Sequence, residues 1–162
     1  MDLPKSGANS GERKPMSVVE PITAVDLCCG AGGWACAARG LAISIVAAVD
    51  WWDMCCLTYA RNHPTIEVIR RDVTEPEFLD WAAELRGSID LVLGAIPCEW
   101  LSVRRNMNNR PKPTEIEQGR AVLDALLAAV RAIEPRWSCL EDVIQIREEN
   151  VDALKKKGNP DE

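Results

Sequence analysis

Short apolar runs, rich in β-branched residues, alternate along the chain with segments in which apolar residues recur every three or four positions. The first pattern predicts strands and the second predicts amphipathic helices. Strands that alternate with helices imply a parallel sheet covered on both faces, so we expect an open α/β fold. The predicted strands are residues 22–27, 43–49, 66–69, 89–93 and 137–140, and the predicted helices are residues 34–39, 53–62, 76–85 and 115–133.

Boundary signals complete this outline. Thr114 and Glu117 have the spacing of a capping box, which predicts that Thr114 caps the longest helix. Residues 1–20 are rich in Gly, Ser, Pro and charge and predict a flexible tail, and the charged stretch 144–157 predicts a final exposed helix. We therefore expect one domain over residues 21–162.

Composition limits the function classes. The chain has 162 residues, 47% of them hydrophobic, which is enough for one globular domain with a sizeable core. Its net charge of −6 argues against binding nucleic acid over the whole surface. The sequence lacks both an apolar run of membrane-spanning length and a secretory signal, so we expect a cytoplasmic protein without a membrane partner.

Seven cysteines invite a metal or disulfide interpretation, which their spacing opposes. There is no Cys-x-x-Cys pair, and His63 is the only histidine, so no zinc or other metal site is predicted. A cytoplasmic location also disfavours disulfides. Most of these thiols are therefore expected to be small core residues.

Polar or unusual residues follow every predicted strand. Carboxyl ends of parallel strands meet at one edge of a sheet, where ligands of open α/β proteins bind. This edge is therefore the predicted functional site. The residues concerned are Asp26 with the glycine-rich turn to Gly33, Asp50, Asp72, Pro97 with Cys98, and Glu141.

The first three strand ends suggest a nucleotide-like cofactor. Glycines after the first strand would let the backbone approach a ligand closely, although any tight strand-to-helix turn has the same composition. Asp50 could accept hydrogen bonds from both ribose hydroxyls. Trp51 could stack on adenine or simply belong to the core. Asp72 could bind the adenine amine or cap the following turn.

The last two strand ends suggest covalent chemistry. Cys98 would be held rigidly after Pro97, where a thiolate is a strong nucleophile, although a lone cysteine is more often inert packing. Glu141 could donate a proton to a substrate or cap a helix. The basic and amide-rich stretch 104–112 could close over a phosphodiester backbone, or be an ordinary solvated loop.

Taken in order, these motifs resemble those of the cytosine-5 methyltransferase family, whose members use S-adenosylmethionine to methylate cytosine in DNA. The turn after Asp26 is similar to the family's D-L-F-x-G-x-G-G motif, and Pro97-Cys98 with Ser102 is similar to P-C-Q-x-x-S, with Glu99 in place of Gln. Glu141-Asp142-Val143 resembles E-N-V. The resemblance covers about residues 22–145. It implies a Rossmann-like methyltransferase fold and the cofactor contacts Asp26, Leu27, Gly30, Gly32, Gly33, Trp34, Asp50, Trp51, Asp72, Val73 and Pro97.

The resemblance also implies a mechanism. Cys98 would add to C6 of a cytosine flipped out of DNA, and protonated Glu141 would donate to N3. C5 would then accept the methyl group of S-adenosylmethionine, and loss of the C5 proton would release the thiolate. Residues 99–112 would form a lid over the base.

The chain departs from the family pattern after the fifth strand. We find no target-recognition region, no Gln-x-Arg-x-Arg motif and no closing segment, so the catalytic domain is predicted to be truncated at its C-terminal end. A missing segment or a second chain would then supply DNA recognition, and the acidic balance fits a catalytic half without its DNA-binding half. Such a chain could be a fragment, one subunit of a split enzyme or a decayed copy.

Three other interpretations remain open. One is a tRNA-methylating relative with the same motifs. A second is a non-catalytic module of the S-adenosylmethionine fold that binds a partner, which the truncation favours and the retention of Cys98 and Glu141 opposes. A third is an unrelated nucleotide-binding oxidoreductase, which the ordered series of motifs disfavours.

Overall fold

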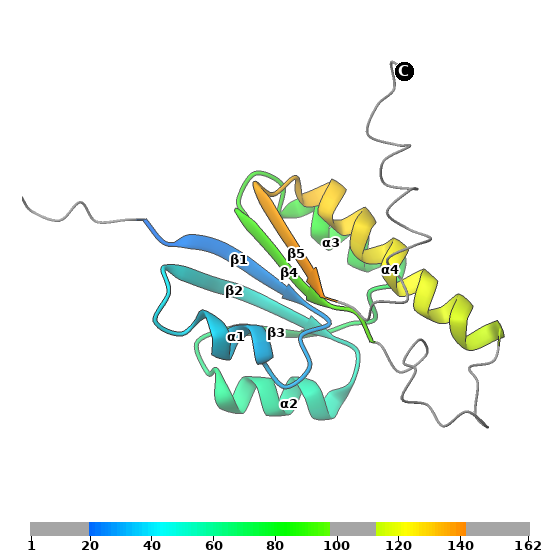
Figure 1. Ribbon diagram of the computed structural model, residues 1–162, viewed down its shortest axis with the longest axis horizontal. Helices are drawn as coiled ribbons and strands as arrows, with labels where there is room; N and C mark the ends of the chain where they lie inside the picture. Colours follow the sequence, from blue (N-terminus) through cyan, green and yellow to red (C-terminus); the bar gives the residue numbers. More distant parts are fainter. Residues whose placement is uncertain (1–19, 98–112, 142–162) are drawn as a thin grey trace, which may run out of the picture.

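A computed structural model of the chain describes residues 20–97 and 113–141, and these form a three-layer α/β domain (Figure 1). The predicted tail, apart from residue 20, and the predicted helix over residues 144–157 lie outside the described residues. Strands and helices alternate as expected. The elements are β1 (Ile22–Leu27), α1 (Gly33–Ala38), β2 (Ile43–Asp50), α2 (Asp53–Asn62), β3 (Glu67–Arg70), α3 (Pro76–Glu84), β4 (Leu91–Ala95), α4 (Pro113–Ile133) and β5 (Trp137–Glu141).

The five strands form one parallel sheet in the order β3-β2-β1-β4-β5. Helices α1 and α2 cover one face, and α3 and α4 cover the other (Figure 1). The order of strands reverses between β1 and β4, which makes their carboxyl ends the switch point where open α/β sheets bind ligands. This topology confirms the predicted α/β class and its parallel sheet.

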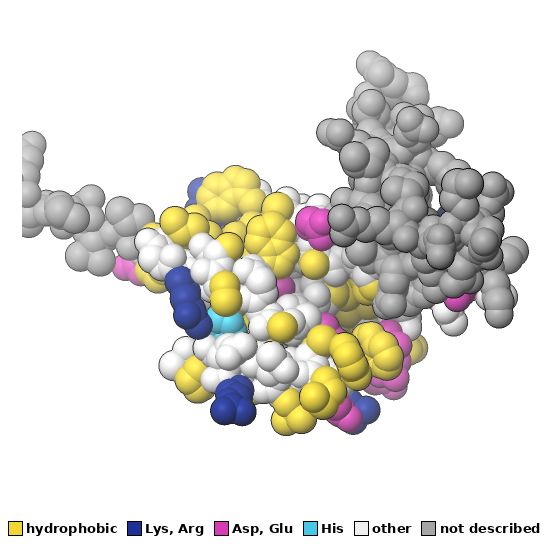
Figure 2. All heavy atoms as spheres, turned by 60° about the horizontal axis from the view of Figure 1, so that its bottom comes forward, with side chains coloured by type: hydrophobic (Ala, Val, Ile, Leu, Met, Phe, Trp, Pro, Cys, Tyr) yellow, Lys and Arg dark blue, Asp and Glu magenta, His cyan; other side chains and the backbone are white. Residues whose placement is uncertain are grey.

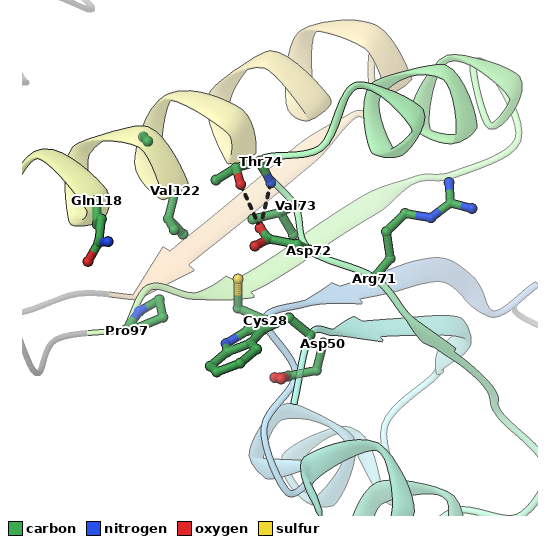
Figure 3. Close-up of a pocket in the computed structure, with 11 residues that line it drawn as sticks. Cys28, Asp50, Arg71, Asp72, Val73, Thr74, Pro97, Gln118 and Val122 are labelled. Atoms are coloured by element: carbon green, nitrogen blue, oxygen red, sulfur yellow. Dashed lines mark hydrogen bonds between the residues drawn. The ribbon is translucent and has the colours of Figure 1, made fainter. Parts of the chain in front are cut away.

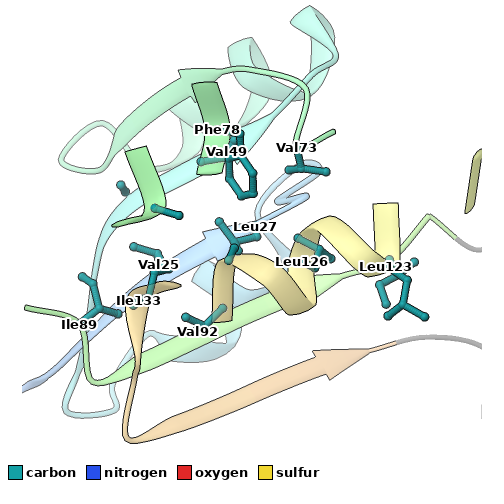
Figure 4. Packing of buried hydrophobic residues seen from close by; sticks show 14 residues of the cluster. Val25, Leu27, Val49, Val73, Phe78, Ile89, Val92, Leu123, Leu126 and Ile133 are labelled. Atoms are coloured by element: carbon teal, nitrogen blue, oxygen red, sulfur yellow. The ribbon is translucent and has the colours of Figure 1, made fainter. Parts of the chain in front are cut away.

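The larger hydrophobic core lies between the sheet and the α3–α4 layer (Figure 4). Leu27, Phe78 and Leu126 are among its fully buried side chains. Burial of each such side chain stabilises the fold by roughly 1.5–3 kcal/mol, whereas exposed ion pairs contribute about 0–1 kcal/mol. The core therefore fixes the sheet, and with it the edge at which the candidate site lies.

The pairing of β1 with β2 contains one irregularity. Ala24 pairs with Ile45 but the next residue, Val25, pairs with Ala47, so Val46 is left over as a bulge. Val46 is exposed. Ile45 packs toward α1 and α2, whereas Ala47 packs toward α3 and α4, so the side chains of β2 change face across the bulge.

Several predicted boundaries differ from the structure by one or two residues, and the starts of α4 and β4 each differ by two. Helix α4 begins at Pro113, so Thr114 lies in the first turn and is not the N-cap, and the predicted capping box is wrong. Proline suits the first helical turn because its φ is already helical and its missing N–H needs no partner. Strand β4 begins at Leu91 and not at residue 89. Asp90, directly before it, bonds to Thr23 and Trp137 through its backbone, and its carboxylate accepts hydrogen bonds from the Thr23 amide and hydroxyl.

Candidate cofactor and active site

The carboxyl ends of β1 to β4 and one side of α4 enclose a cavity of about 390 Å³ (Figure 3). This volume falls within the range of small-molecule sites. Five of the residues predicted to contact a cofactor line the cavity together. They are Asp50, Trp51, Asp72, Val73 and Pro97.

Asp50 joins the end of β2 to the glycine turn, which we define as residues 30–33. Its two carboxylate oxygens accept hydrogen bonds from the amides of Gly30 and Trp52, each at 2.9 Å. A carboxylate oxygen has more than one lone pair, so Asp50 can accept further bonds from a ligand on the cavity side. Trp51 is 61% exposed, so it does not belong to the core, and its indole is free to meet a ligand at the cavity mouth.

Asp72 caps the turn that leads from β3 into α3. Its Oδ1 accepts hydrogen bonds from the Thr74 amide at 2.9 Å and from the Thr74 hydroxyl at 2.8 Å (Figure 3). The capping alternative from the sequence is therefore present in the structure. Asp72 also lines the cavity, beside the buried Val73, so capping does not remove it from the site.

Gly32 is required in the glycine turn by its backbone and by its neighbour. Its φ is +99°, a conformation that residues with a side chain rarely adopt. A Cβ at this position would also lie 2.6 Å from Nε2 of His63, behind the turn. Gly33 has neither constraint, because its φ is not positive and a Cβ there would meet nothing within 4 Å.

This contrast gives a matched pair of variants. Gly32→Ala is expected to lower the free energy of unfolding by about 2–4 kcal/mol, because backbone strain and overpacking add. Gly33→Ala is expected to change it by less than about 1 kcal/mol. Urea unfolding followed by tryptophan fluorescence measures both. Equal losses in the two variants would contradict the role assigned to Gly32.

Asp26 lies under the glycine turn with its carboxyl group fully buried. Its Oδ2 accepts a hydrogen bond from the Tyr59 hydroxyl at 3.1 Å, and Oδ1 has no hydrogen-bond partner among the described residues. Burial raises the pKa of Asp26 to about 7; the Tyr59 hydrogen bond opposes this shift and the charge of Asp50 adds to it. Asp26 therefore titrates near neutral pH.

The raised pKa of Asp26 predicts a pH-dependent stability. Because the folded state binds this proton more tightly than the unfolded state, the contribution is fully present below about pH 4 and is lost as the pH rises through about 7. Relative to Asp26→Asn, which cannot titrate, the wild type should lose about 2–3 kcal/mol between roughly pH 5 and 8. Urea unfolding of both proteins across this range measures the difference. Parallel pH profiles would contradict the prediction.

The end of β5 lies directly beside the exit of β4. Ala95 pairs with Glu141, and the Ile96 amide donates to the Glu141 carbonyl at 3.0 Å. Glu141 itself is exposed. Pro97 lines the cavity, but the predicted nucleophile Cys98 lies outside the described residues, as do Glu99, Ser102, Asp142, Val143 and the basic stretch 104–112.

Several predicted residues do not line the cavity. Leu27 belongs to the core, and Trp34 on α1 packs against the smaller core cluster on the α1–α2 side of the sheet. Asp26 lies behind the turn, and Gly32 within the turn faces His63 and not the cavity. Gly30 and Gly33 leave open space where a side chain would project. Gly30 and Gly33 can therefore contact a ligand only through the backbone, or they act by setting the shape of the turn.

Other residues line the cavity without having been predicted. Cys28 is one, and burial, followed by the charge of Asp50, raises the pKa of its thiol to about 12. It is therefore an apolar wall and not a second nucleophile. Arg71 and Thr74 flank predicted positions. The other lining residues come from α4, whose pattern predicts a helix but not what it faces: Gln118, Ala121 and Val122.

Exposed apolar side chains surround the start of α2, next to the cavity mouth. Trp52, Met54 and Leu57 are each more than half exposed, and apolar side chains gather on the face shown in Figure 2.

Within residues 20–97 and 113–141, no three His, Cys, Asp or Glu side chains are grouped as metal ligands. In the same part of the chain, no helix has the length and apolar character needed to cross a bilayer.

Comparisons with known proteins place this geometry in context. The structure is similar to a protein described as a DNA modification methyltransferase of a prophage (E. coli), with a TM-score of 0.61, 20% identity, and coverage of 84% of this chain and 36% of that one. It is also similar to the S. pombe Dnmt2 methyltransferase, with a TM-score of 0.59, 17% identity, and coverage of 84% and 39%. A DNMT2 mutant from Spodoptera frugiperda gives a TM-score of 0.51, 21% identity, and coverage of 84% and 40%.

These likenesses establish the fold, and the chain spans 36% to 40% of the length of the three structures. No curated protein sequence matches the chain significantly. The family model for C-5 cytosine-specific DNA methylase matches residues 22–158, which is most of the chain. The chain therefore belongs to the C-5 cytosine-specific DNA methylase family.

Proposed function

We propose that this chain supplies the cofactor-binding and nucleophile-bearing part of a DNA cytosine-5 methyltransferase that uses S-adenosylmethionine. The observation that supports this most is the single cavity shared by Asp50, Trp51 and Asp72, at the carboxyl edge of the sheet and next to Pro97. Four separate strand ends contribute to it, so its composition does not follow from any one motif.

The residues present fit a nucleoside with a charged tail. Asp50 offers lone pairs for two ribose hydroxyls, and Trp51 offers an exposed ring for adenine. Asp72 and Val73 provide a carboxylate and an apolar contact for the base, and the backbone at Gly30 is open to the ligand. When bound, S-adenosylmethionine supplies an electrophilic methyl group on its sulfonium.

The chain's own residues then make cytosine reactive. The Cys98 thiolate adds to C6 of a flipped cytosine while Glu141 donates a proton to N3, which turns C5 into a nucleophile. C5 would then take the methyl group, with S-adenosylhomocysteine as the leaving group. Loss of the C5 proton to a base would break the bond between sulfur and C6 and restore the thiolate, and the proton on N3 would return to Glu141. The backbone contact between Ile96 and Glu141 supports this pairing, because it keeps the segment that leads to Cys98 next to the proposed acid.

We place the recognition of a DNA sequence outside the described residues, in a further segment or a second chain. A net charge of −6 supports the separation of catalysis from DNA recognition, because a surface that binds the phosphates of DNA needs an excess of positive charge. In this proposal residues 21–162 form the catalytic domain, and residues 1–20 take no part in catalysis.

Transfer of a labelled methyl group tests the proposal. The chain is incubated with methyl-labelled S-adenosylmethionine and with either duplex DNA or tRNA, and the nucleosides are then separated. Label in 5-methylcytosine of DNA is the expected result. Label in tRNA alone would overturn the proposed substrate. Binding of the cofactor without transfer to either nucleic acid, both by this chain and after the recognition segment or second chain has been added, would reduce the chain to a binding module and overturn the proposed catalysis.

A further inference from the structure

His63 is held behind the glycine turn, on the opposite side from the cavity. Only 7% of the residue is exposed, and it appears as a small cyan patch in Figure 2. Its Nε2 lies so close to Gly32 that a Cβ at Gly32 would be 2.6 Å away. The ring of Tyr59, one helical turn earlier on α2, packs against the imidazole with 4.9 Å between centroids.

Tyr59 and His63 together contact both sides of the turn. The Tyr59 hydroxyl donates to Asp26 at the end of β1, just before the turn, and His63 contacts Gly32 near its end. The Cys36 sulfur on α1 lies 3.8 Å from Nε2 of His63. A row of polar groups therefore follows the rear of the turn: Asp26, Tyr59 and His63 are buried, and Cys36 on α1 is exposed.

The charge state of His63 suits this position. Burial, and after it the positive charge of Arg39 directly after α1, lower the pKa of the imidazole below its usual value, although a hydrogen bond with the Gly32 backbone opposes the shift. The ring is therefore neutral at neutral pH and can remain buried without a counter-ion.

We propose that Tyr59 and His63 are positioning residues for the cofactor, which set the shape of the glycine turn although neither lines the cavity. Glycine has the greatest backbone freedom of any residue, so a glycine turn without support would lose more entropy on binding a ligand. Support from α2 removes part of this cost before binding, which raises the affinity. The inference rests on the proposed function in one respect, which is that the ligand bound at the glycine turn is S-adenosylmethionine.

Calorimetric titration with S-adenosylhomocysteine provides the first test. We expect His63→Ala to weaken binding by about tenfold or more, because the turn is then no longer ordered in advance. His63→Gln should restore affinity to within about threefold of the wild type, because its amide nitrogen can replace Nε2 beside Gly32. Ile133→Val, a core change at the far end of α4, should lower stability without changing affinity. Equal losses in His63→Ala and His63→Gln would overturn the proposal.

Hydrogen exchange at isotope-labelled glycine amides, measured without any ligand, separates this inference from the proposed function. We expect faster exchange at Gly32 and Gly33 in His63→Ala than in the wild type, with other amides in the sheet unchanged. If the wild type fails to bind S-adenosylhomocysteine, the proposed function fails and the exchange result still decides the role of His63. Unchanged exchange in His63→Ala would overturn the proposal.

Discussion

Replacing Cys98 with alanine is expected to lower methyl transfer by at least about a thousandfold, because cytosine C5 becomes a nucleophile only after a thiolate has added to C6. The clearest measurement uses DNA that contains 5-fluorocytosine. The C5 fluorine cannot leave as the proton does, so the reaction stops with the protein bonded to the base. The wild type should form an adduct that survives a denaturing gel, and Cys98→Ala should form none.

The chain provides a matched control for this experiment. Cys139 is an exposed thiol on β5, the strand that ends at the proposed acid Glu141. Cys139→Ala should therefore leave adduct formation unchanged. An adduct that persists in Cys98→Ala and disappears in Cys139→Ala would identify Cys139 as the nucleophile and would refute the mechanism.

Replacing Asp50 with alanine is expected to weaken S-adenosylhomocysteine binding by about a hundredfold, or roughly 3 kcal/mol, because hydrogen bonds to a charged group contribute about 1.5–3 kcal/mol each. Two effects act in the same direction. The ribose loses its acceptor, and the Gly30 and Trp52 amides lose theirs, so the turn and the start of α2 are held less firmly against β2. Calorimetric titration measures the change in affinity.

Asp53→Ala is the control for Asp50→Ala, because it removes the same charge three residues later. The Asp53 carboxylate pairs with Arg70 at 2.7 Å, with both side chains more than 60% exposed, so the pair contributes at most about 1 kcal/mol to stability. Affinity should stay within about twofold of the wild type. If Asp53→Ala weakened binding as much as Asp50→Ala does, general electrostatics and not ribose contact would explain both results.

Much of the fold follows from sequence patterns because its three central strands, β1, β2 and β4, are largely buried. An apolar run such as 43–49 is compatible with few structures besides a central parallel strand, and the predicted helix over residues 53–62 coincides with α2. The errors lie at the ends of elements. Where β4 begins depends on its pairing with β1 and β5, and contacts such as that of Asp90 with Thr23, 67 positions earlier, are contained in no local pattern.

The strand-end residues of the candidate site follow more directly from the sequence than the residues that α4 contributes to the cavity. Asp50 and Asp72 stand at strand ends, and parallel strands bring their ends together, so sequence order alone implies one cavity edge. Gln118 and Val122 were missed because the angle at which α4 crosses the sheet decides what they face. His63 was considered only as a metal ligand, since its contact with Gly32 depends on how α2 packs behind the turn.

The unpaired residue in β2 marks a position where this strand can change in length as well as in identity. Val46 is exposed, so exchanging it for another β-former alters little besides the surface. Deleting it would place Ala47 directly after Ile45, as Val25 directly follows Ala24 in β1, so the side chains would still alternate between the two layers and Asp50 would stay beside the Gly30 amide. Deleting a paired residue such as Ala48 would instead turn Asp50 toward the α3–α4 layer, so two deletions only two positions apart have opposite consequences for the site.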